Sequence, residues 1–312
     1  MINPNLKIDH VHLKVSNLET SLQFYNSFLG FKIIKEEAKT VFLSSSSTSN
    51  NKDSSMFLVA LTEIKNNDTS YKFQHKPRIA GLYHFAILLP ERRYLASFLK
   101  HVQKNLDPGY YEGMADHAVS ESIYLHDPDL NGIEVYSDRL PSEWKWKDYT
   151  VHMVTEALDV KDLLKESVAV DDNDEWDKLP PNTSIGHVHL HSSNLSKAKE
   201  FYHDILELNH TSTLPGAYFF AADMYHHHIA INTWLGENIP PAYSYGNNSP
   251  GLDHYAINLH NKNDLLLLKN KLLEFKIDVD EQIIGNDNQF SSSSFYAYDF
   301  DGIKIQFLYS NH

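Results

Sequence analysis

The fold is decided by a segment that occurs twice in the chain. It reads IDHVHLKVSNLETSLQFY at residues 8–25 and IGHVHLHSSNLSKAKEFY at residues 185–202. In both copies, alternating apolar residues predict a strand, a Ser-Asn pair is a helix N-cap signal, and apolar residues at helical spacing follow. An offset of 177 residues relates the two copies from His10 and His187 onward. Because the match is too long for chance, we interpret the chain as an internal duplication.

A second kind of unit alternates with the first. Residues 81–87 (GLYHFAI) predict a strand that leads into a helix and a closing hairpin, and residues 251–257 (GLDHYAI) begin the later copy of this unit. Because every unit combines strands with a helix, the predicted fold class is α+β. Four units follow one another, near residues 8–65, 80–137, 185–235 and 251–310.

These units divide the chain into two predicted domains. The N-terminal domain spans residues 1–140 and the C-terminal domain spans residues 183–312. Residues 141–182 are predicted to form a linker with a helix of mixed, mainly acidic composition. The segment from Ser44 to Ser55 is rich in Ser and Asn, which predicts a mobile hairpin tip.

The composition excludes several classes of protein. The chain has no cysteine, so it contains no disulfide, zinc–thiolate site or thiol nucleophile. A net charge of −14 disfavours nucleic acid as a partner. No apolar run approaches the roughly 18 residues of a membrane span, and no signal peptide is recognisable, so we expect a cytoplasmic protein. The 19 histidines favour a metal site without locating it.

The closing hairpin of the second unit carries a buried-looking carboxylate. Residues 117–134 read HAVSESIYLHDPDLNGIE, in which two strand-like runs flank a turn at Asp127–Gly132. Glu134 lies among apolar neighbours on the returning strand. Taken alone, such a residue is more often an exposed side chain on the outer face of a sheet. The remainder of the chain favours a functional role instead.

The chain resembles the vicinal oxygen chelate superfamily over nearly its whole length. Within that superfamily it is similar to type I extradiol ring-cleaving dioxygenases, close to the bacterial catechol-2,3-dioxygenase group. The family signature is matched by His117, Tyr124, Asp127 with its following Pro, and Glu134, while Leu130 replaces the usual Gly of the turn. The resemblance implies four βαβββ modules that pair into open, cup-shaped mixed sheets around a metal ion.

Family members hold Fe(II) with two histidines and one glutamate, and Mn(II) suits the same ligands. The first-strand histidine occurs in all four units, at His10, His84, His187 and His254. In the fourth unit the glutamate position holds Gln306, a neutral amide and a poorer ligand. We therefore predict that the metal is bound by His84, Glu134 and His187, and that His10 and His254 are vestigial.

The resemblance also assigns catalytic roles. His227, in a predicted strand from Tyr225 to Asn232, would act on O₂ and assist proton transfer. His117 and Tyr124 would be hydrogen-bonding and acid–base partners of the substrate oxygens, although Tyr124 could equally be a core residue. In the first unit, residues 55–60 (SMFLVA) take the place of this strand and contain no histidine, which favours a site built from units two and three.

The remaining histidines of these strands are assigned by alternation. His226 and His228 should face away from His227, so we predict a structural role for both. Other histidines follow a first-strand histidine at the two-residue period of a strand and would point into the same cup or line it: His12, His189 and His191.

Two questions stay open at this level. If consecutive modules pair, the site would instead contain His10, His84 and Glu134, without His227 beside it. The function could also differ: a glyoxalase-like isomerase would usually need a second carboxylate, and a metal-free drug-sequestering protein would need only the cup. We predict an Fe(II)-dependent extradiol dioxygenase that cleaves a catechol-type diol with O₂ to a muconic semialdehyde, as a homo-oligomer.

Overall fold

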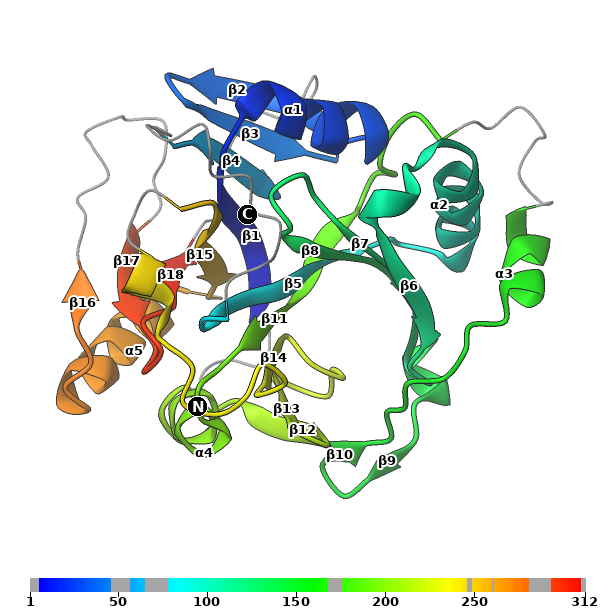
Figure 1. Cartoon of the computed structure of the whole chain (residues 1–312). Coiled ribbons are helices and arrows are strands. Elements are labelled where there is room, and N and C mark those ends of the chain that lie inside the picture. Colours follow the sequence, from blue (N-terminus) through cyan, green and yellow to red (C-terminus); the bar gives the residue numbers. More distant parts are fainter. Residues whose placement is uncertain are drawn as a thin grey trace.

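Two curved, eight-stranded mixed sheets form the body of the computed structural model (Figure 1). The structure describes residues 6–45, 57–64, 78–167, 176–245, 249–259, 261–280 and 293–309. The predicted α+β class with repeated βαβββ units is confirmed. Most of the segment predicted as a mobile hairpin tip, Ser44–Ser55, lies outside the described residues. No helix in the described part of the chain is long and apolar enough to cross a membrane.

The first sheet joins units one and four, which come from opposite ends of the chain. Unit one contributes β1 (Lys7–Val15), α1 (Leu18–Leu22), a π-helical continuation (Gln23–Phe28), β2 (Lys32–Glu37), β3 (Thr40–Ser44) and β4 (Val59–Glu63). Unit four contributes β15 (Gly251–Asn258), α5 (Lys262–Glu274), β16 (Val279–Asp280), β17 (Ser293–Tyr298) and β18 (Lys304–Tyr309). The units meet where β1 pairs antiparallel with β15, with His12 opposite His254.

The second sheet joins units two and three in the same way. Unit two contributes β5 (Gly81–Leu88), α2 (Arg92–Asn105), β6 (Tyr111–Asp116), β7 (Ser120–His126) and β8 (Gly132–Asp138). Unit three contributes β11 (Ser184–His191), α4 (Leu195–Lys199), a π-helical continuation (Glu200–Ile205), β12 (Asn209–Leu214), β13 (Ala217–Ala221) and β14 (Ile229–Asn232). Strand β5 pairs antiparallel with β11. Of the two pairings that the sequence left open, the structure therefore has two with three.

The segment between the halves contains β9 (Trp146–Lys147), β10 (Thr150–Val151) and α3 (Val160–Glu166). Both sheets take strands from both predicted domains, and the boundaries at residues 1–140 and 183–312 stay a prediction.

The repeated helix starts follow the predicted cap chemistry. The side chain of Asn17 accepts a hydrogen bond from the Thr20 N–H at 2.8 Å, and Asn194 accepts one from the Lys197 N–H at 3.0 Å. These bonds satisfy backbone donors that have no partner within the helix. Gly30 follows the first helix with a φ of +89°, and a Cβ there would lie 2.6 Å from the Cα of Lys178, so only glycine fits.

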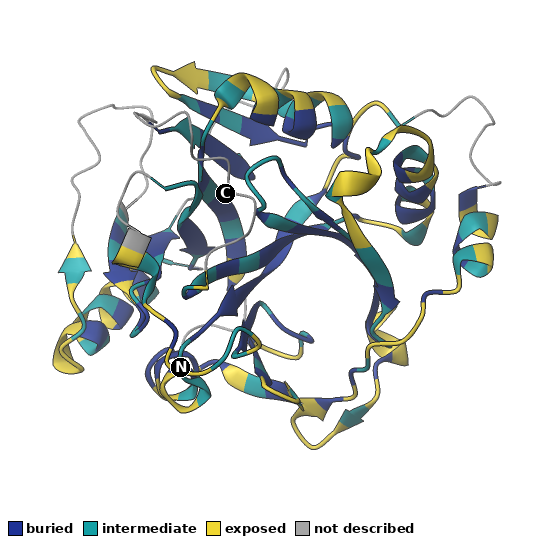
Figure 2. Ribbon diagram, in the orientation of Figure 1, coloured by how far each residue is buried: buried dark blue, intermediate teal, exposed yellow. Residues whose placement is uncertain are grey.

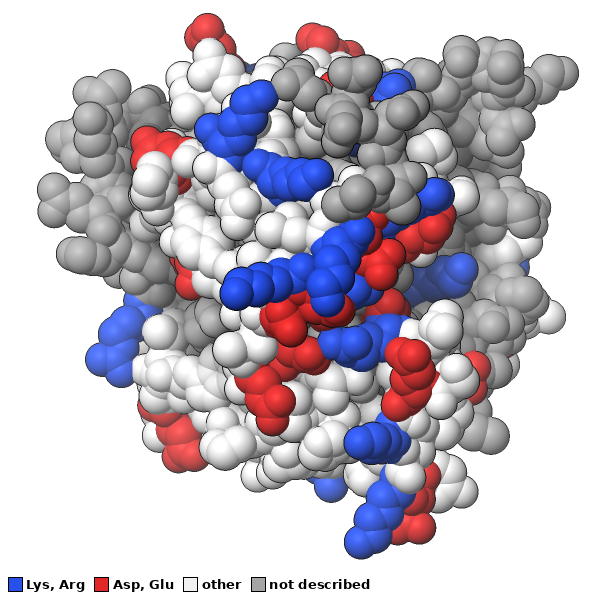
Figure 3. Space-filling view, turned by 90° about the vertical axis from the view of Figure 1, so that its right-hand side faces the viewer, with Lys and Arg blue, Asp and Glu red and all other residues white. Residues whose placement is uncertain are grey.

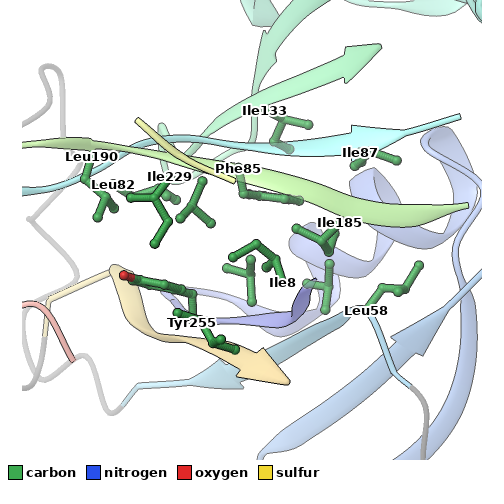
Figure 4. Close-up of a cluster of buried hydrophobic side chains, with 14 of the residues drawn as sticks. Ile8, Leu58, Leu82, Phe85, Ile87, Ile133, Ile185, Leu190, Ile229 and Tyr255 are labelled. Atoms are coloured by element: carbon green, nitrogen blue, oxygen red, sulfur yellow. The ribbon is translucent and has the colours of Figure 1, made fainter. Parts of the chain in front are cut away.

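The main core fills the space between the two sheets. Side chains from the central strands of both sheets point toward one another, among them Ile8, Phe85, Ile185 and Tyr255 (Figure 4). The central strands are accordingly buried along most of their length, while the outer helices and edge strands carry the exposed residues (Figure 2). Because strand side chains alternate, the residues between these core positions face the concave side of each sheet.

Buried tyrosines connect consecutive units across the two sheets. Tyr25 belongs to the π-helical segment that follows α1, and its hydroxyl donates to Asp127 in the β7–β8 turn at 2.9 Å. Its repeat counterpart Tyr202 donates to Asp299 in the β17–β18 turn, also at 2.9 Å. The same bond therefore occurs in both halves and holds the turn of one sheet against a helix of the other.

The segment after β8 is attached to unit two by ion pairs. On this face of the molecule, positive and negative side chains interleave (Figure 3). The nearly buried Glu121 on β7 accepts from both Arg92 and Arg139, and Arg92 also contacts Asp162 and Glu166 of α3. The connecting segment is thereby held beside β6, where it reaches the concave side of the second sheet.

Candidate metal centre

Three neighbouring strands of the second sheet bring the predicted ligands together. On β8, Glu134 lies opposite Ala86 of β5, and on β11, His187 also lies opposite Ala86. His84 is two residues before Ala86 and therefore projects from the same face of β5. The small side chain of Ala86 leaves the space above it open, so that the three larger side chains converge there.

The convergence is close and buried. The Oε2 atom of Glu134 lies 2.9 Å from Nε2 of His84 and 3.0 Å from Nε2 of His187. All three residues are at most 5% exposed. Ser122 on β7 donates to the other carboxylate oxygen, Oε1, at 2.5 Å, which orients the Glu134 carboxylate.

These residues fit a divalent metal ion. Nε2 of His84 is buried without a hydrogen-bond partner and faces the Glu134 carboxylate, so it is a donor atom available to a metal ion at this point. Burial lowers the pKa of His84, which keeps the imidazole neutral and its lone pair free. Burial acts to raise the pKa of Glu134, but His187 and His84 outweigh it and hold that pKa well below its ordinary value. Two imidazoles and one carboxylate are a typical ligand set for Fe(II).

A cavity of about 200 Å³ opens beside this cluster. An apolar cavity of roughly 150 Å³ holds a benzene molecule, so the volume suits one aromatic ring. Its apolar walls come from several elements and include Tyr83, Met153, Leu214, Phe219 and Trp234. The structure also places all six predicted site residues in this lining: His84, His117, Tyr124, Glu134, His187 and His227.

The predicted acid–base pair is directly hydrogen bonded. Nδ1 of His117 lies 2.7 Å from the carbonyl oxygen of Val154, so Nδ1 carries the proton and donates it. Nε2 of His117 then accepts from the Tyr124 hydroxyl, also at 2.7 Å. Burial, followed by the charge of Glu134, raises the pKa of Tyr124 well above its ordinary value, so the phenol is protonated. Tyr124 also lies opposite Glu134 in the β7–β8 ladder.

His227 covers the His187 side of the cluster. Their ring centroids are 4.1 Å apart with an interplanar angle of 49°. Burial, with the neighbouring imidazoles, lowers the pKa of His227 well below its ordinary value, so this ring is neutral. His189 also lines the cavity, and its Nε2 accepts from the Asn232 amide at 2.9 Å. Nδ1 of His191 donates to the side-chain oxygen Oδ1 of the same Asn232 at 2.8 Å.

One prediction about this region is wrong. The strand predicted from Tyr225 begins only at Ile229, and the preceding residues are irregular. Side chains do not alternate along irregular backbone, so His226 does not face away from its neighbour. Its Nδ1 lies 2.8 Å from Nδ1 of His227.

For two of the cavity residues, nothing in the sequence indicated that they would lie near the site. Met153 and Thr155 belong to the segment between the two halves, which the sequence marks only as a linker. An isolated β-bridge, made by backbone hydrogen bonds between Asp116 and Glu156, holds this segment beside β6. Periodicity within the linker does not predict that contact, because the contact depends on how the segment folds back over unit two.

The first sheet keeps the architecture of the site but changes its chemistry. Gln306 lies opposite Ala256, as Glu134 lies opposite Ala86. Phe57 stacks on His10 with ring centroids 4.1 Å apart, in the place that His227 takes over His187. The predicted loss of function in this half agrees with a neutral amide and an apolar ring at these two positions.

A second group of possible ligands occurs in this sheet, formed by His12, Asp253 and His254. The Lys304 ammonium lies 3.8 Å from the Asp253 carboxylate and opposes a second cation there. Asp253 and Lys304 also line a larger cavity, of about 460 Å³, which contains none of the predicted site residues.

Comparison with known proteins agrees with this geometry. Residues 7–135 match the family model of the Glyoxalase/Bleomycin resistance protein/Dioxygenase superfamily. The catechol-2,3-dioxygenase of Bacillus subtilis (strain 168) is 36% identical over 283 residues, which cover 90% of this chain and 92% of that protein. The chain belongs to this superfamily. Its predicted class, a dioxygenase of the superfamily, is thereby confirmed.

Solved structures of the superfamily share the fold. A putative dioxygenase from Bacillus subtilis subsp. subtilis str. 168 superposes with a TM-score of 0.61 at 11% identity, over 98% of this chain and 86% of that chain. Glyoxalase I from Zea mays has a TM-score of 0.55 at 15% identity, over 97% of this chain and 92% of that chain. At these identities the likeness concerns the fold alone.

Proposed function

We propose that this superfamily member is an extradiol dioxygenase that binds Fe(II) through His84, Glu134 and His187. It cleaves a catechol-type aromatic diol with O₂ to a muconic semialdehyde. The observation that carries the proposal is the convergence of these three side chains on one buried point beside a cavity of single-ring size. The relationship to the Bacillus catechol-2,3-dioxygenase supports the same reaction class. Mn(II) would be held by the same donors.

The metal ion would supply Lewis acidity toward the diol hydroxyls and one-electron chemistry toward O₂. The chain supplies the remainder of the site. Met153, Leu214, Phe219 and Trp234 form apolar walls that would pack against an aromatic ring. A diol bound in this space would have the ligand cluster and Tyr124 in the same cavity wall.

Tyr124 and His117 form a proton-accepting pair. The Tyr124 hydroxyl donates to Nε2 of His117, so its oxygen lone pairs are free to accept a hydrogen bond from a diol hydroxyl. As the diol loses its proton to Tyr124 Oη, the Tyr124 proton moves to His117. The Val154 carbonyl oxygen, bonded to Nδ1, then stabilises the imidazolium. On the opposite side of the cluster, His227 is a neutral imidazole available for proton transfer at oxygen.

The proposal is tested by metal content and ring cleavage in matched variants. Protein purified anaerobically and loaded with Fe(II) is analysed for iron per chain, and catechol-dependent O₂ uptake and yellow semialdehyde are recorded. Wild type should hold about one iron per chain, and Glu134→Gln should lose both the iron and the product. Gln306→Ala, the corresponding position of the first sheet, is the control and should retain both.

Two outcomes would contradict the proposal. Iron retained in Glu134→Gln but lost in Gln306→Ala would place the metal in the first sheet. Wild-type protein that binds neither iron nor manganese would favour the metal-free binding protein. A glyoxalase-like isomerase is disfavoured because Glu134 is the one carboxylate in this ligand cluster among the described residues. Conversion of a 2-oxoaldehyde–thiol adduct without O₂ uptake would nevertheless indicate it.

A further inference from the structure

A chain of hydrogen bonds runs from His227 in the cavity wall toward the protein surface. Nδ1 of His227 lies 2.8 Å from Nδ1 of His226, and Nε2 of His226 lies 2.8 Å from Oδ1 of Asp138. The Tyr225 hydroxyl donates to the other oxygen of Asp138, Oδ2, at 2.9 Å. His226 is completely buried, whereas the Asp138 side chain is 21% exposed. This series of hydrogen bonds therefore connects a cavity residue with a partly exposed carboxylate.

The proton positions in this chain follow from its end at Asp138. A carboxylate only accepts hydrogen bonds, so Nε2 of His226 carries a proton and donates it. In the form of His226 that carries this one proton, Nδ1 has a lone pair and accepts from Nδ1 of His227. With its single proton on Nδ1, the neutral His227 ring has a bare lone pair on Nε2, its one remaining nitrogen.

The surroundings of His226 hold it in this orientation. The ring of Tyr225 lies 4.1 Å from the His226 ring and the ring of Trp144 lies 5.2 Å from it, on centroids. Tyr225 is in turn bonded to the Tyr136 hydroxyl at 2.9 Å. His226 thus has little freedom to turn away from either of its two hydrogen-bond partners.

The first sheet shows that a ring can cover the ligand-position histidine without any hydrogen bonds to a carboxylate. There Phe57 covers His10 at the same centroid distance of 4.1 Å, without a nitrogen at all. A purely structural cover over the ligand histidine can therefore be apolar. In the second sheet the covering ring is instead a histidine, and its hydrogen bonds through His226 to Asp138 give its two nitrogens defined roles.

We infer that Asp138 and His226 are positioning residues that hold His227 in its Nδ1–H tautomer. His227 then presents Nε2 to the cavity as a proton acceptor, not as a donor. The catalytic meaning of this inference rests on the proposed function, because a base at this place takes a proton from the substrate or from a reacting oxygen.

The inference is tested with Asp138→Asn. The Tyr225 hydroxyl donates to the side-chain oxygen, so the amide nitrogen of the variant faces Nε2 of His226 and donates to it. The proton of His226 moves to Nδ1, and His227 becomes the Nε2–H tautomer. Tyr225→Phe is the matched control, because it removes a bond to the same carboxylate and leaves the His226–Asp138 bond in place.

The tautomer is read by ¹⁵N–¹H long-range NMR on metal-free protein with ¹⁵N-labelled histidine, and the His227 signals are assigned by their loss in His227→Phe. Wild type and Tyr225→Phe should show Nδ1–H at His227, and Asp138→Asn should show Nε2–H. Turnover of catechol by the iron-loaded protein should fall by about 10- to 100-fold in Asp138→Asn and stay near wild type in Tyr225→Phe.

The outcomes separate this inference from the proposed function. An Nε2–H tautomer in wild type, or equal turnover and tautomer in Asp138→Asn and wild type, overturns the inference even if catechol is cleaved. Equal loss of turnover in both variants with no tautomer change also overturns it, since a structural role would produce that result. A tautomer reversal in a protein that cleaves no catechol upholds the positioning role and rejects the proposed function.

Discussion

Gln306 occupies the register position in the first sheet that Glu134 occupies in the second, each lying opposite an alanine of the neighbouring central strand. The histidines beside them are also arranged alike. The ring centroids of His10 and His254 are 5.6 Å apart, and those of His84 and His187 are 5.5 Å apart. One amide in place of one carboxylate is therefore the main difference between two otherwise similar ligand sets.

A metal site should accordingly be recoverable in the first sheet by Gln306→Glu. Nδ1 of His10 and of His254 each bond a neighbouring aspartate at 2.7 Å, which leaves Nε2 as the free nitrogen of both rings. We expect the metal content after Mn(II) loading and dialysis to rise from about one to about two per chain. Turnover should not rise, because Phe57 lies where the second sheet has His227.

The matched control for this substitution is Gln306→Met, which has similar size and no oxygen ligand. It should leave the metal content at the wild-type value. A ratio that stays at one after Gln306→Glu would show that Lys304 or the local geometry, and not the missing carboxylate, prevents binding.

The buried Asp127 should make stability depend on pH. Burial is the main reason that its pKa is raised from 3.8 to about 6 in the folded protein. Because the folded state holds this proton more tightly than the unfolded chain does, its stabilising contribution is present below about pH 4 and is lost as the pH rises through about 6. At 1.36 kcal/mol per pKa unit, the loss is about 3 kcal/mol.

Urea unfolding of wild type and Asp127→Asn between pH 4 and 8 measures this contribution. The free energy of unfolding of wild type, taken relative to that of the variant, should fall across this range. Tyr25→Phe removes a donor to the same carboxylate and should make the fall steeper. A difference between wild type and Asp127→Asn that is independent of pH would contradict a raised pKa at this residue.

Gly186 is required beside the ligand His187. A Cβ at this position would lie 1.7 Å from the Tyr136 hydroxyl oxygen and 2.8 Å from its ring carbon Cζ. Gly186→Ala should therefore displace β11 or Tyr136, with a cost of about 1 to 3 kcal/mol in the free energy of unfolding. Because His187 is the next residue, metal affinity should fall together with stability.

Tyr136→Phe provides the matched test of that contact. Removing the hydroxyl relieves the shorter of the two clashes, so the double variant should recover part of the stability and of the metal affinity lost in Gly186→Ala. Calorimetric melting and Mn(II) titration measure the two effects. If Tyr136→Phe adds its own loss to that of Gly186→Ala with no recovery, the contact is not the cause.

The sequence by itself was sufficient to predict the four repeated units and the residue types of the metal ligands. The duplication aligns residues that occupy equivalent strand positions, and cap chemistry at Asn17 and Asn194 is local, so both can be predicted without knowledge of the tertiary fold. The same comparison singled out Glu134 against Gln306. The resemblance to the dioxygenase family assigned the metal to His84, Glu134 and His187, whereas alternation within one strand cannot relate residues on different strands.

Only the tertiary structure decided which units share a sheet. The pattern of β5 is the same whether its neighbour is β1 or β11, so the sequence left both pairings open, and the strand register shows that β5 pairs with β11. The contact between His226 and His227 depends on irregular backbone before β14, where alternation has no meaning. The linker residues Met153 and Thr155 reach the cavity because backbone hydrogen bonds between Asp116 and Glu156 hold their segment beside β6. Such contacts join residues far apart in the chain, and no local period encodes them.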